Sequence, residues 1–424
     1  MNENRRAIQW LMIANTISGI AQGISMLAIP WYFAKSGEAN LFGWSFFLAN
    51  IFMLFVAPFS GVLIDKYDRV KVFIYLFLFI GIIELSISAI ALQSGGIKFP
   101  FIYLVFLLTF LSYSIHYPNL YALIQQITPA EKYGKLTSIL EIQGQFSTIV
   151  AGALGAILLD GSDGYIKILG IHLGSFFRFE PWKIEWIFIV DAITYFLAAL
   201  ILTKLKFKPL VQLQIDHSPV FIRMADGWHY LWGRKHILWF GIFSLGIFAT
   251  LMVESFTLLP AYVKYCLDQG AGVFAAAEIY YAVGALTAGL IIRKLFHKIK
   301  VPISILIMTM ITAVGYILVA IFQSTLLLFV YSVILGLCNA GTRIQRMSYL
   351  FSVIPNQFMG RVSSIFNLSN IFTRIILTGI VSIPLFGPSM QVQFGLIFLG
   401  IFLLLCFVIL WIVYKRQGDN LKTE

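Results

Sequence analysis

The amino-acid sequence predicts an all-α membrane protein, with twelve transmembrane helices in two pseudo-symmetric six-helix halves. Of its 424 residues, 59% are hydrophobic and 12% are charged, about half the charged share of an average soluble protein. Apolar runs of roughly 20 residues, the length that an α-helix needs to cross a bilayer, follow one another along the chain. A short motif also recurs once in the second half of the chain, which indicates an internal duplication.

Each apolar run predicts one membrane-crossing helix, with its ends placed to within a few residues. The first run follows Arg5 and Arg6. It is too long for a signal-peptide core and has no small-residue cleavage site, so we expect it to be retained. The twelve runs lie near residues 8–34, 42–64, 72–92, 100–126, 136–159, 186–204, 237–263, 273–292, 301–321, 325–350, 360–386 and 391–414.

The repeated motif divides the chain. Pro129 and the pair Gly134-Lys135 recur as Pro355 and Gly360-Arg361, in each case 226 residues later. Two six-helix halves with a substrate site between them are a common design of secondary transporters. The predicted organisation is an N-terminal half (1–204), a cytoplasmic linker (205–236) and a C-terminal half (237–424).

The linker contains aromatic and apolar residues at helical spacing between Phe221 and Trp232. This pattern predicts an amphipathic helix on the inner membrane surface. The alternative is a simple linker whose tryptophans anchor the membrane interface. In the longest outer loop, residues 160–185, glycines and charges are mixed, and we expect a small hairpin or a lid there.

The net charge of +11 reflects membrane topology rather than affinity for nucleic acid. Of the 30 lysines and arginines, six fall in outer loops, three fall within helices and the remaining 21 lie on the inside. By the positive-inside rule, both termini are expected in the cytoplasm and the protein in the cytoplasmic membrane.

Catalytic chemistry is not indicated. The sequence contains no nucleotide-binding Gly-x-x-x-x-Gly-Lys-Ser/Thr loop, no catalytic triad and no metal-ligand cluster. Its three cysteines, Cys266, Cys338 and Cys406, lie in or near separate helices and are expected to be packing residues. We therefore expect neither an enzyme nor a cofactor or metal.

The turn after the second run is rich in charge, from Gly61 through Asp65, Asp68 and Arg69 to Lys71. Gly61 allows two helices to approach closely, and Asp65 lies where the chain leaves the bilayer. An ordinary basic inner loop is the alternative, but such a loop has no need of an acidic residue in a fixed Gly-x-x-x-Asp frame.

This turn resembles the helix 2–3 motif of the major facilitator superfamily, with Asp68 in place of its second glycine, as in the macrolide-efflux branch. His116-x-Pro118 in the fourth run and Val190-Asp191-Ala192 in the sixth are also similar to that branch. The resemblance implies a major facilitator fold. It also implies a conformational latch formed by Gly61, Asp65 and Arg69, with Gly360 and Arg361 at the matching position in the second half.

Two departures concern the coupling mechanism. The fourth run holds no arginine, which many drug:proton antiporters carry there. The fifth run has Ala151-Gly152-Ala153-Leu154-Gly155, without the proline of the antiporter motif.

Charged residues within the membrane are costly and therefore mark candidate functional sites. The candidates for proton coupling are Glu254, Glu141, Glu84 and His116. Glu254 is favoured, because helix 7 faces the cavity in the family that the chain resembles and because Pro260 is expected to distort that helix. Structural ion pairs or hydrogen-bonded packing residues are the alternatives. Asp191 and Glu278 are placed near the outer surface.

Arg343 and Arg374 are the candidates for substrate binding, since either can meet an anionic group or hold a glutamate. Arg346 is expected to extend to the cytoplasmic headgroups. Aromatic residues, 16% of the chain, suit a cavity for bulky apolar compounds, although ordinary packing and lipid contact account for most of them.

The favoured function is a monomeric secondary active transporter that exports hydrophobic or amphipathic, macrolide-type drugs by proton antiport and alternating access. This function implies antibiotic or multidrug resistance. The expected partners are the small-molecule substrate, protons and membrane lipid, and not nucleic acid. Two alternatives remain: an exporter of a siderophore or lipid-like metabolite, and a non-transporting membrane partner of an ATPase.

Overall fold

The computed structural model describes residues 2–129, 132–168, 171–209, 220–383 and 392–420. For a further set within these ranges, including Gly61, Asp65, Gly134 and Lys135, only the backbone is described. The latch prediction at Gly61 and Asp65 therefore lies outside the described side chains.

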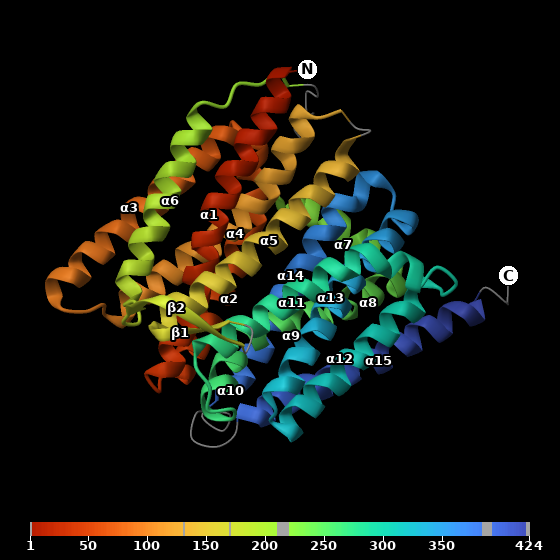
Figure 1. Ribbon diagram of the computed structural model, residues 1–424. Helices are drawn as coiled ribbons and strands as arrows, with labels where there is room; N and C mark the ends of the chain where they lie inside the picture. The colour runs from red at the N-terminus through yellow and green to blue at the C-terminus, as the bar shows by residue number, and fades with distance from the viewer. Residues whose placement is uncertain (1, 130–131, 169–170, 210–219, 384–391, 421–424) are drawn as a thin grey trace. The chain divides into compact units, whose positions relative to one another are not determined.

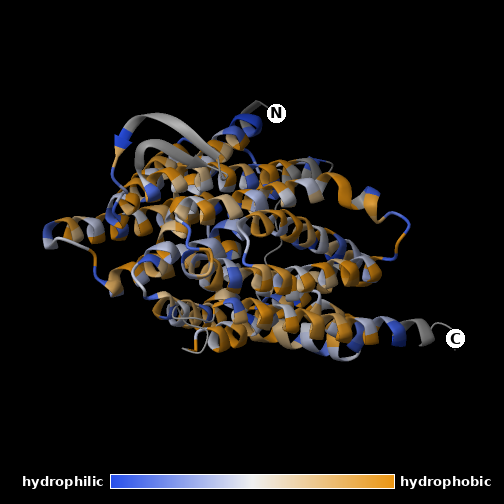
Figure 2. Cartoon of the chain, turned by 60° about the horizontal axis from the view of Figure 1, so that its bottom comes forward, coloured by the Kyte–Doolittle hydropathy of each residue, from blue (hydrophilic) through white to orange (hydrophobic). Residues whose placement is uncertain are grey.

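Almost all of the described chain is helical, and the predicted helices are confirmed. Within the described ranges, twelve segments are long and apolar enough to cross a membrane. Hydrophobic residues run along these helices, and hydrophilic residues gather at helix ends and in connecting loops (Figure 2). The protein is thus a multi-pass membrane protein.

The first six spans correspond to single helices, drawn from red to yellow-green in Figure 1. They are α1 (Asn2–Lys35), α2 (Ala39–Lys66), α3 (Arg69–Ser94), α4 (Phe99–Ile127), α5 (Tyr133–Asp160) and α6 (Ile184–Thr203).

The predicted linker helix is α7 (Val220–Trp232), and the span after it is broken into four pieces. These pieces are α8 (Lys235–Phe243), α9 (Gly246–Val253), a π-helical turn η2 (Glu254–Leu258) and α10 (Leu259–Tyr265). The remaining helices are α11 (Ala271–Leu295), α12 (Val301–Phe322), α13 (Thr325–Val353), α14 (Asn356–Val381) and α15 (Val392–Asn420).

The loop between α5 and α6, predicted on the outer side, forms the expected hairpin. Strands β1 (Ser162–Ile168) and β2 (Ile171–Phe179) pair antiparallel, with Ser162 opposite Phe179. The register shifts between Asp163 and Tyr165, which marks a bulge.

The helices form two compact units. One contains residues 1–32 and 55–217, and the other contains residues 33–54 and 218–424. Residues 33–54 pack with the second unit through specific contacts. The Tyr265 hydroxyl donates to the Ala34 carbonyl at 2.6 Å, and the Phe46 and Phe256 rings lie 5.0 Å apart.

In the first unit, α3 and α6 run side by side (Figure 1). Gly81 allows this approach, because a Cβ there would lie 3.3 Å from the Ala192 carbonyl oxygen and 3.1 Å from the Phe196 ring. The core next to this crossing includes Phe73, Phe77 and Tyr195.

In the second unit, α11 and α13 cross more closely. A Cβ on Gly284 would lie 1.9 Å from the Val333 carbonyl oxygen, and one on Gly336 would lie 2.0 Å from that of Tyr281. No side chain fits at either glycine, so backbone meets backbone at this crossing.

Candidate functional site

The second unit brings two carboxylates together, one predicted as the coupling residue and one not. Glu254 is 4% exposed, and Glu278 on α11 lies close enough to interact with it electrostatically. The Ser255 hydroxyl donates to Glu254 Oε2 at 3.3 Å and lies beside Glu278. We refer to Glu254, Glu278 and Ser255 as the C-terminal acidic cluster.

Glu254 opens the π-helical turn η2, which ends just before Pro260. Proline has no N–H to donate to the carbonyl four residues earlier, so the α-helical hydrogen-bond pattern cannot pass through it unchanged. The predicted distortion is confirmed, and π turns of this kind are frequent at functional sites.

A second polar group extends from the cluster towards the inner end of α13. Asn339 donates to the Tyr281 hydroxyl at 2.8 Å, and the charge of Arg343 acts on the same tyrosine. The close crossing at Gly336 places these helices near enough for the bond. Neither Tyr281 nor Asn339 was predicted, because single-helix periodicity does not reveal partners on another helix.

Arg343 is exposed although it lies within a membrane-spanning helix. It is ten residues from the C-terminal end of α13, or about 15 Å along the helix axis. A charge at that depth is stable when it lines a water-filled region. This geometry fits the predicted contact with an anionic group.

Arg374 differs from Arg343 because it is buried, at 7% exposed. It belongs to a row of buried polar residues, spaced four apart, in the last turns of α14 and at its C-cap: Asn370, Arg374, Thr378 and Ser382. Residues at this spacing lie on one helix face. Asn370 and Thr378 have no hydrogen-bond partner for their side chains among the described residues, so this face holds polar groups that are available to a ligand or to water.

The remaining predicted proton carriers lie in the first unit, and two of them have hydrogen-bond partners. His116 Nε2 lies 2.7 Å from Asn15 Oδ1, and its ring packs against Phe73 and Phe77 at centroid distances of 5.0 and 5.6 Å. Glu141 accepts a 2.9 Å bond from the Tyr121 hydroxyl and is half-buried.

Glu84 has a different environment. It is 0% exposed and lies close to Asp191, which is also 0% exposed. None of the four carboxylate oxygens has a hydrogen-bond partner among the described residues. The sequence placed Asp191 near the outer surface and missed this pairing, although Gly81, one turn before Glu84, signals a close helix crossing there.

The inner turn shows how Asp68 and Arg69 act. Asp68 caps α3 by accepting the backbone N–H of Lys71 at 2.9 Å, the usual role of aspartate at a helix start. The buried Arg69 donates to the Ala122 carbonyl at 2.8 Å and to Gln126 Oε1 at 3.3 Å. Arg69 therefore ties the start of α3 to the end of α4.

At the matching position in the second half, Arg361 forms an ion pair with Asp226 of α7 at 3.0 Å. Tyr230 of α7 stacks on Phe358 at 4.5 Å, and Gly227 lies against the Arg361 backbone. Gly360 is exposed, with open space around it. The linker helix is thus docked on the start of α14.

The exposed face of α7 carries Phe221, Ile222, Trp228 and Trp232. Trp228 and Trp232 stack on each other at 5.6 Å. The opposite face holds the contacts with α14, so the helix is amphipathic as predicted.

The prediction for Arg346 was wrong. Instead of extending to the headgroups, its guanidinium is partly buried and donates to the Ser244 carbonyl at 3.2 Å. Ser244 ends α8, where the break in the span leaves carbonyl groups without helical partners.

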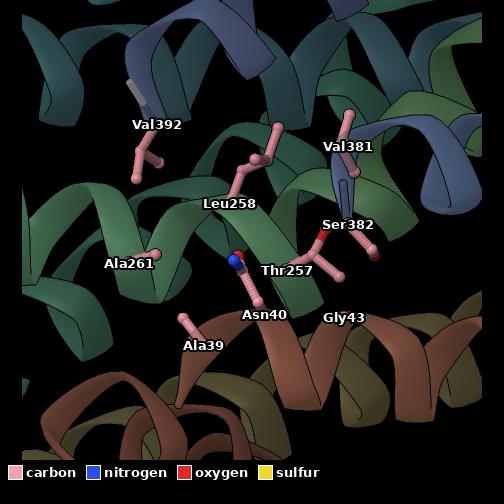
Figure 3. Close-up of a pocket in the computed structure, with 9 residues that line it drawn as sticks. All are labelled: Ala39, Asn40, Gly43, Thr257, Leu258, Ala261, Val381, Ser382 and Val392. Carbon is pink, nitrogen blue, oxygen red and sulfur yellow. The ribbon is translucent and has the colours of Figure 1, made fainter. Parts of the chain in front are cut away.

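One pocket of the second unit lies where the start of α2 meets η2 and the end of α14. Asn40, Thr257 and Ser382 supply its polar groups (Figure 3). Its cavity volume is about 10 Å³, room for about one water molecule and far below the roughly 300–1,000 Å³ of sites for drug-sized ligands.

Comparison with known proteins agrees with this architecture. The chain matches macrolide efflux protein A of Streptococcus pyogenes with 24% identity over 287 residues, 65% of this chain and 63% of the relative's length. The chain thus aligns with less than two thirds of this curated relative.

Several solved transporter structures share the fold. The nucleoside transporter NupG gives a TM-score of 0.67 at 14% identity, covering 96% of this chain and 99% of that one. A bacterial homologue of the iron transporter ferroportin gives 0.66 at 14% identity, with 96% and 98% covered. A bacterial homologue of the lysosomal transporter Spinster gives 0.70 at 12% identity, with 97% of each chain covered.

The family model of the Major Facilitator Superfamily matches residues 11–378, which is most of the chain. Together with the twelve spans, this match makes the protein a membrane transporter rather than an enzyme. The chain belongs to the major facilitator superfamily.

Proposed function

We propose that the protein exports hydrophobic, macrolide-type compounds across the cytoplasmic membrane in exchange for protons, by alternating access. The observation that carries this proposal is the C-terminal acidic cluster, in which buried Glu254 opens a π-helical turn next to half-buried Glu278. The weak similarity to a macrolide efflux protein supports the substrate class.

Proton exchange is assigned first to Glu254. The buried Glu254 carboxylate accepts a hydrogen bond from one hydroxyl among the described residues, that of Ser255. It also lies near the like charge of Glu278. Burial and the neighbouring charge of Glu278 suit this carboxyl group to carry a proton and to release it when the environment of the cluster changes. Glu141, held by Tyr121, is the second candidate, and His116, held by Asn15, is the third.

Substrate contact is assigned to Arg343 and to the polar face of α14 around Arg374. Macrolide-type compounds are bulky and largely apolar, so most of their contacts need no directional hydrogen bond. Arg343 then provides the specific polar contact, because it is exposed within a span.

The proposed mechanism needs two moving halves, residues 1–204 and 237–424, joined by the linker 205–236. In this proposal the protein works as a monomer with both termini in the cytoplasm. The inner turn from Gly61 to Arg69 and the Gly360-Arg361 turn serve as its latch. Arg69 and Arg361 support this role, since each ties a helix start to a neighbouring helix.

Accumulation of a labelled macrolide such as erythromycin in a drug-sensitive bacterial strain tests the proposal. Cells with the protein should accumulate less of it than cells without, and an uncoupler should abolish the difference. Glu254→Gln and Glu141→Gln variants should lose export at unchanged amounts of membrane protein. Glu180→Gln, which removes an exposed carboxylate outside the spans, is the charge-matched control.

Two results would contradict the proposal. Export that persists in the presence of the uncoupler excludes proton coupling. Normal export by both Glu254→Gln and Glu141→Gln excludes the assigned carriers while leaving the fold untouched.

A second candidate substrate is an anionic siderophore or lipid-like metabolite. The exposed guanidinium of Arg343 within a span favours it, because such a group pairs with a carboxylate or phosphate. Export of an anionic compound with no effect on macrolide accumulation would favour this reading over the first.

A further inference from the structure

The first unit contains an oxygen-lined site that the proposed transport mechanism does not use. Four helices converge on it: α3 supplies Glu84, α6 supplies Asp191 and Tyr195, α1 supplies Ser25, and α4 supplies Ser112. All except Tyr195 are 0% exposed, and Tyr195 is 1% exposed. We call this group the N-terminal oxygen cluster.

The two carboxylates of the cluster are close because α3 and α6 cross at a glycine. The approach of Gly81 to the Ala192 carbonyl fixes the crossing one turn from Glu84 and next to Asp191. At this spacing the two carboxylates interact electrostatically. The described surroundings supply no lysine, arginine or histidine contact to either carboxylate.

The hydroxyls around the carboxylates are also unused. Ser25 Oγ lies near Asp191. By hydrogen-bond geometry, Ser25 Oγ and Ser112 Oγ have no partner among the described residues. Ser112 lies beside the hydroxyl of Tyr195, which accepts a 3.0 Å bond from Gln22. Buried hydroxyls normally have partners, so several vacant oxygens around one point indicate a missing ligand.

From these oxygens we infer that the N-terminal oxygen cluster binds a hard metal cation, Na⁺ or Ca²⁺, between Glu84 and Asp191. Hard cations take carboxylate and hydroxyl oxygens as ligands. A single cation offsets the repulsion of two buried carboxylates and provides a partner for Ser25 at the same time. A shared proton supplies one hydrogen bond and leaves both serine hydroxyls without a partner.

Thermal unfolding of the purified full-length protein in detergent tests the site. Na⁺, Ca²⁺, K⁺ and Mg²⁺ are compared with N-methyl-D-glucamine at matched ionic strength. The bound cation should raise the melting temperature by about 3 °C or more at saturation, because it binds the folded state alone. The salt that raises the melting temperature, that of Na⁺ or of Ca²⁺, identifies the bound cation. Retention of ²²Na⁺ or ⁴⁵Ca²⁺ by the protein measures its affinity directly.

Three substitutions locate the site. Glu84→Gln and Asp191→Asn should each abolish the shift and the retained label. Ser25→Ala keeps both carboxylates and should weaken affinity by about tenfold, the usual effect of losing a supporting contact. It therefore tests the site even where a carboxylate variant fails to fold. Glu180→Gln, an exposed carboxylate of the same unit, should bind as the unmodified protein does.

Equal melting temperatures in all five salts, with no retained label, would overturn the inference. A melting temperature that depends on pH alone would mean that Glu84 and Asp191 share a proton instead. A cation shift that survives in Glu84→Gln and Asp191→Asn would also overturn it. The test uses no transported compound, so its outcome is separate from that of the proposed export.

Discussion

Each unit of the protein buries a pair of carboxylates, but the two pairs have different surroundings. Glu84 and Asp191 are fully enclosed and have no hydrogen-bond partner among the described residues. Glu254 has a hydroxyl donor, and its neighbour Glu278 is half-buried, beside a break in helix geometry. Glu278 is partly accessible to solvent, whereas the enclosed pair must be neutralised by a proton or by a counter-charge. On this comparison we propose proton exchange at the second pair and retention of a ligand at the first.

The helix crossings beneath the two pairs differ in tightness, and this gives the largest expected effect. Gly336→Ala places a Cβ 2.0 Å from a backbone carbonyl, which only a shift of two helices relieves, at a cost of about 3 kcal/mol or more. The Cβ of Gly81→Ala would lie 3.1 Å from the movable Phe196 ring and 3.3 Å from the Ala192 carbonyl oxygen. We expect this substitution to cost about 1 kcal/mol of stability.

Fluorescence-detected size-exclusion chromatography after heating ranks these variants. Gly289→Ala is the control, because a Cβ there has open space around it. A Gly336→Ala protein as stable as Gly289→Ala would mean that the close crossing of α11 and α13 does not exist.

The second prediction separates the two carboxylate pairs by function. Glu254→Gln should reduce uncoupler-sensitive export by about a hundredfold, comparable with the loss of a positioned proton-transfer group. Glu84→Gln should reduce it less than about tenfold in a sodium- and calcium-replete medium, since that pair is enclosed. Initial rates of efflux from preloaded cells measure both, and the opposite order would reverse the assignment of roles.

The third prediction concerns the exposed cation next to the C-terminal acidic cluster. Arg343→Gln should raise the half-saturating concentration of an anionic substrate by about tenfold. This factor corresponds to the binding free energy of one charge-assisted hydrogen bond. A neutral substrate should change little. Arg343→Lys retains the positive charge but loses the planar guanidinium with its paired N–H donors, so we expect an intermediate effect. Concentration-dependent uptake into inverted vesicles provides the comparison, and equal effects on both substrate types would count against direct contact.

The smallest effect is expected at the ion pair between the linker helix and α14. Asp226 and Arg361 are 47% and 30% exposed, and pairs of this kind contribute less than about 1 kcal/mol. Asp226→Asn should therefore leave the melting temperature nearly unchanged at moderate salt. A large drop would mean that α7 depends on this contact rather than on the stacking of Tyr230 and Phe358.

The architecture could be predicted from sequence because it depends on local pattern. Apolar length defines a membrane helix wherever it occurs, and the helical spacing of Phe221 to Trp232 defines α7. Pro260 predicts a helix distortion because its missing N–H removes a hydrogen bond within the same helix. The membership of the family followed from the residues of the inner turn.

The candidate sites could be predicted only in part, because they depend on contacts between different helices, which local sequence patterns do not show. Glu254 was predicted beside a helix distortion and is buried at one, but Glu278 and Ser255 were not joined to it. Asp191 was not joined to Glu84, because counting depth along one helix does not reveal its neighbours on another. Arg346 was assigned to the headgroups because its partner, the Ser244 carbonyl, becomes available only when the span breaks.

The π turn has a practical consequence for anyone who designs variants of this span. It holds one residue more than an α turn, so the angular position of every later side chain is offset by about 100° from a regular wheel. A helical wheel drawn from Lys235 without that correction misplaces the side chains of α10 by the same angle. Cysteine labelling or cross-linking positions in α10 are best counted afresh from Leu259.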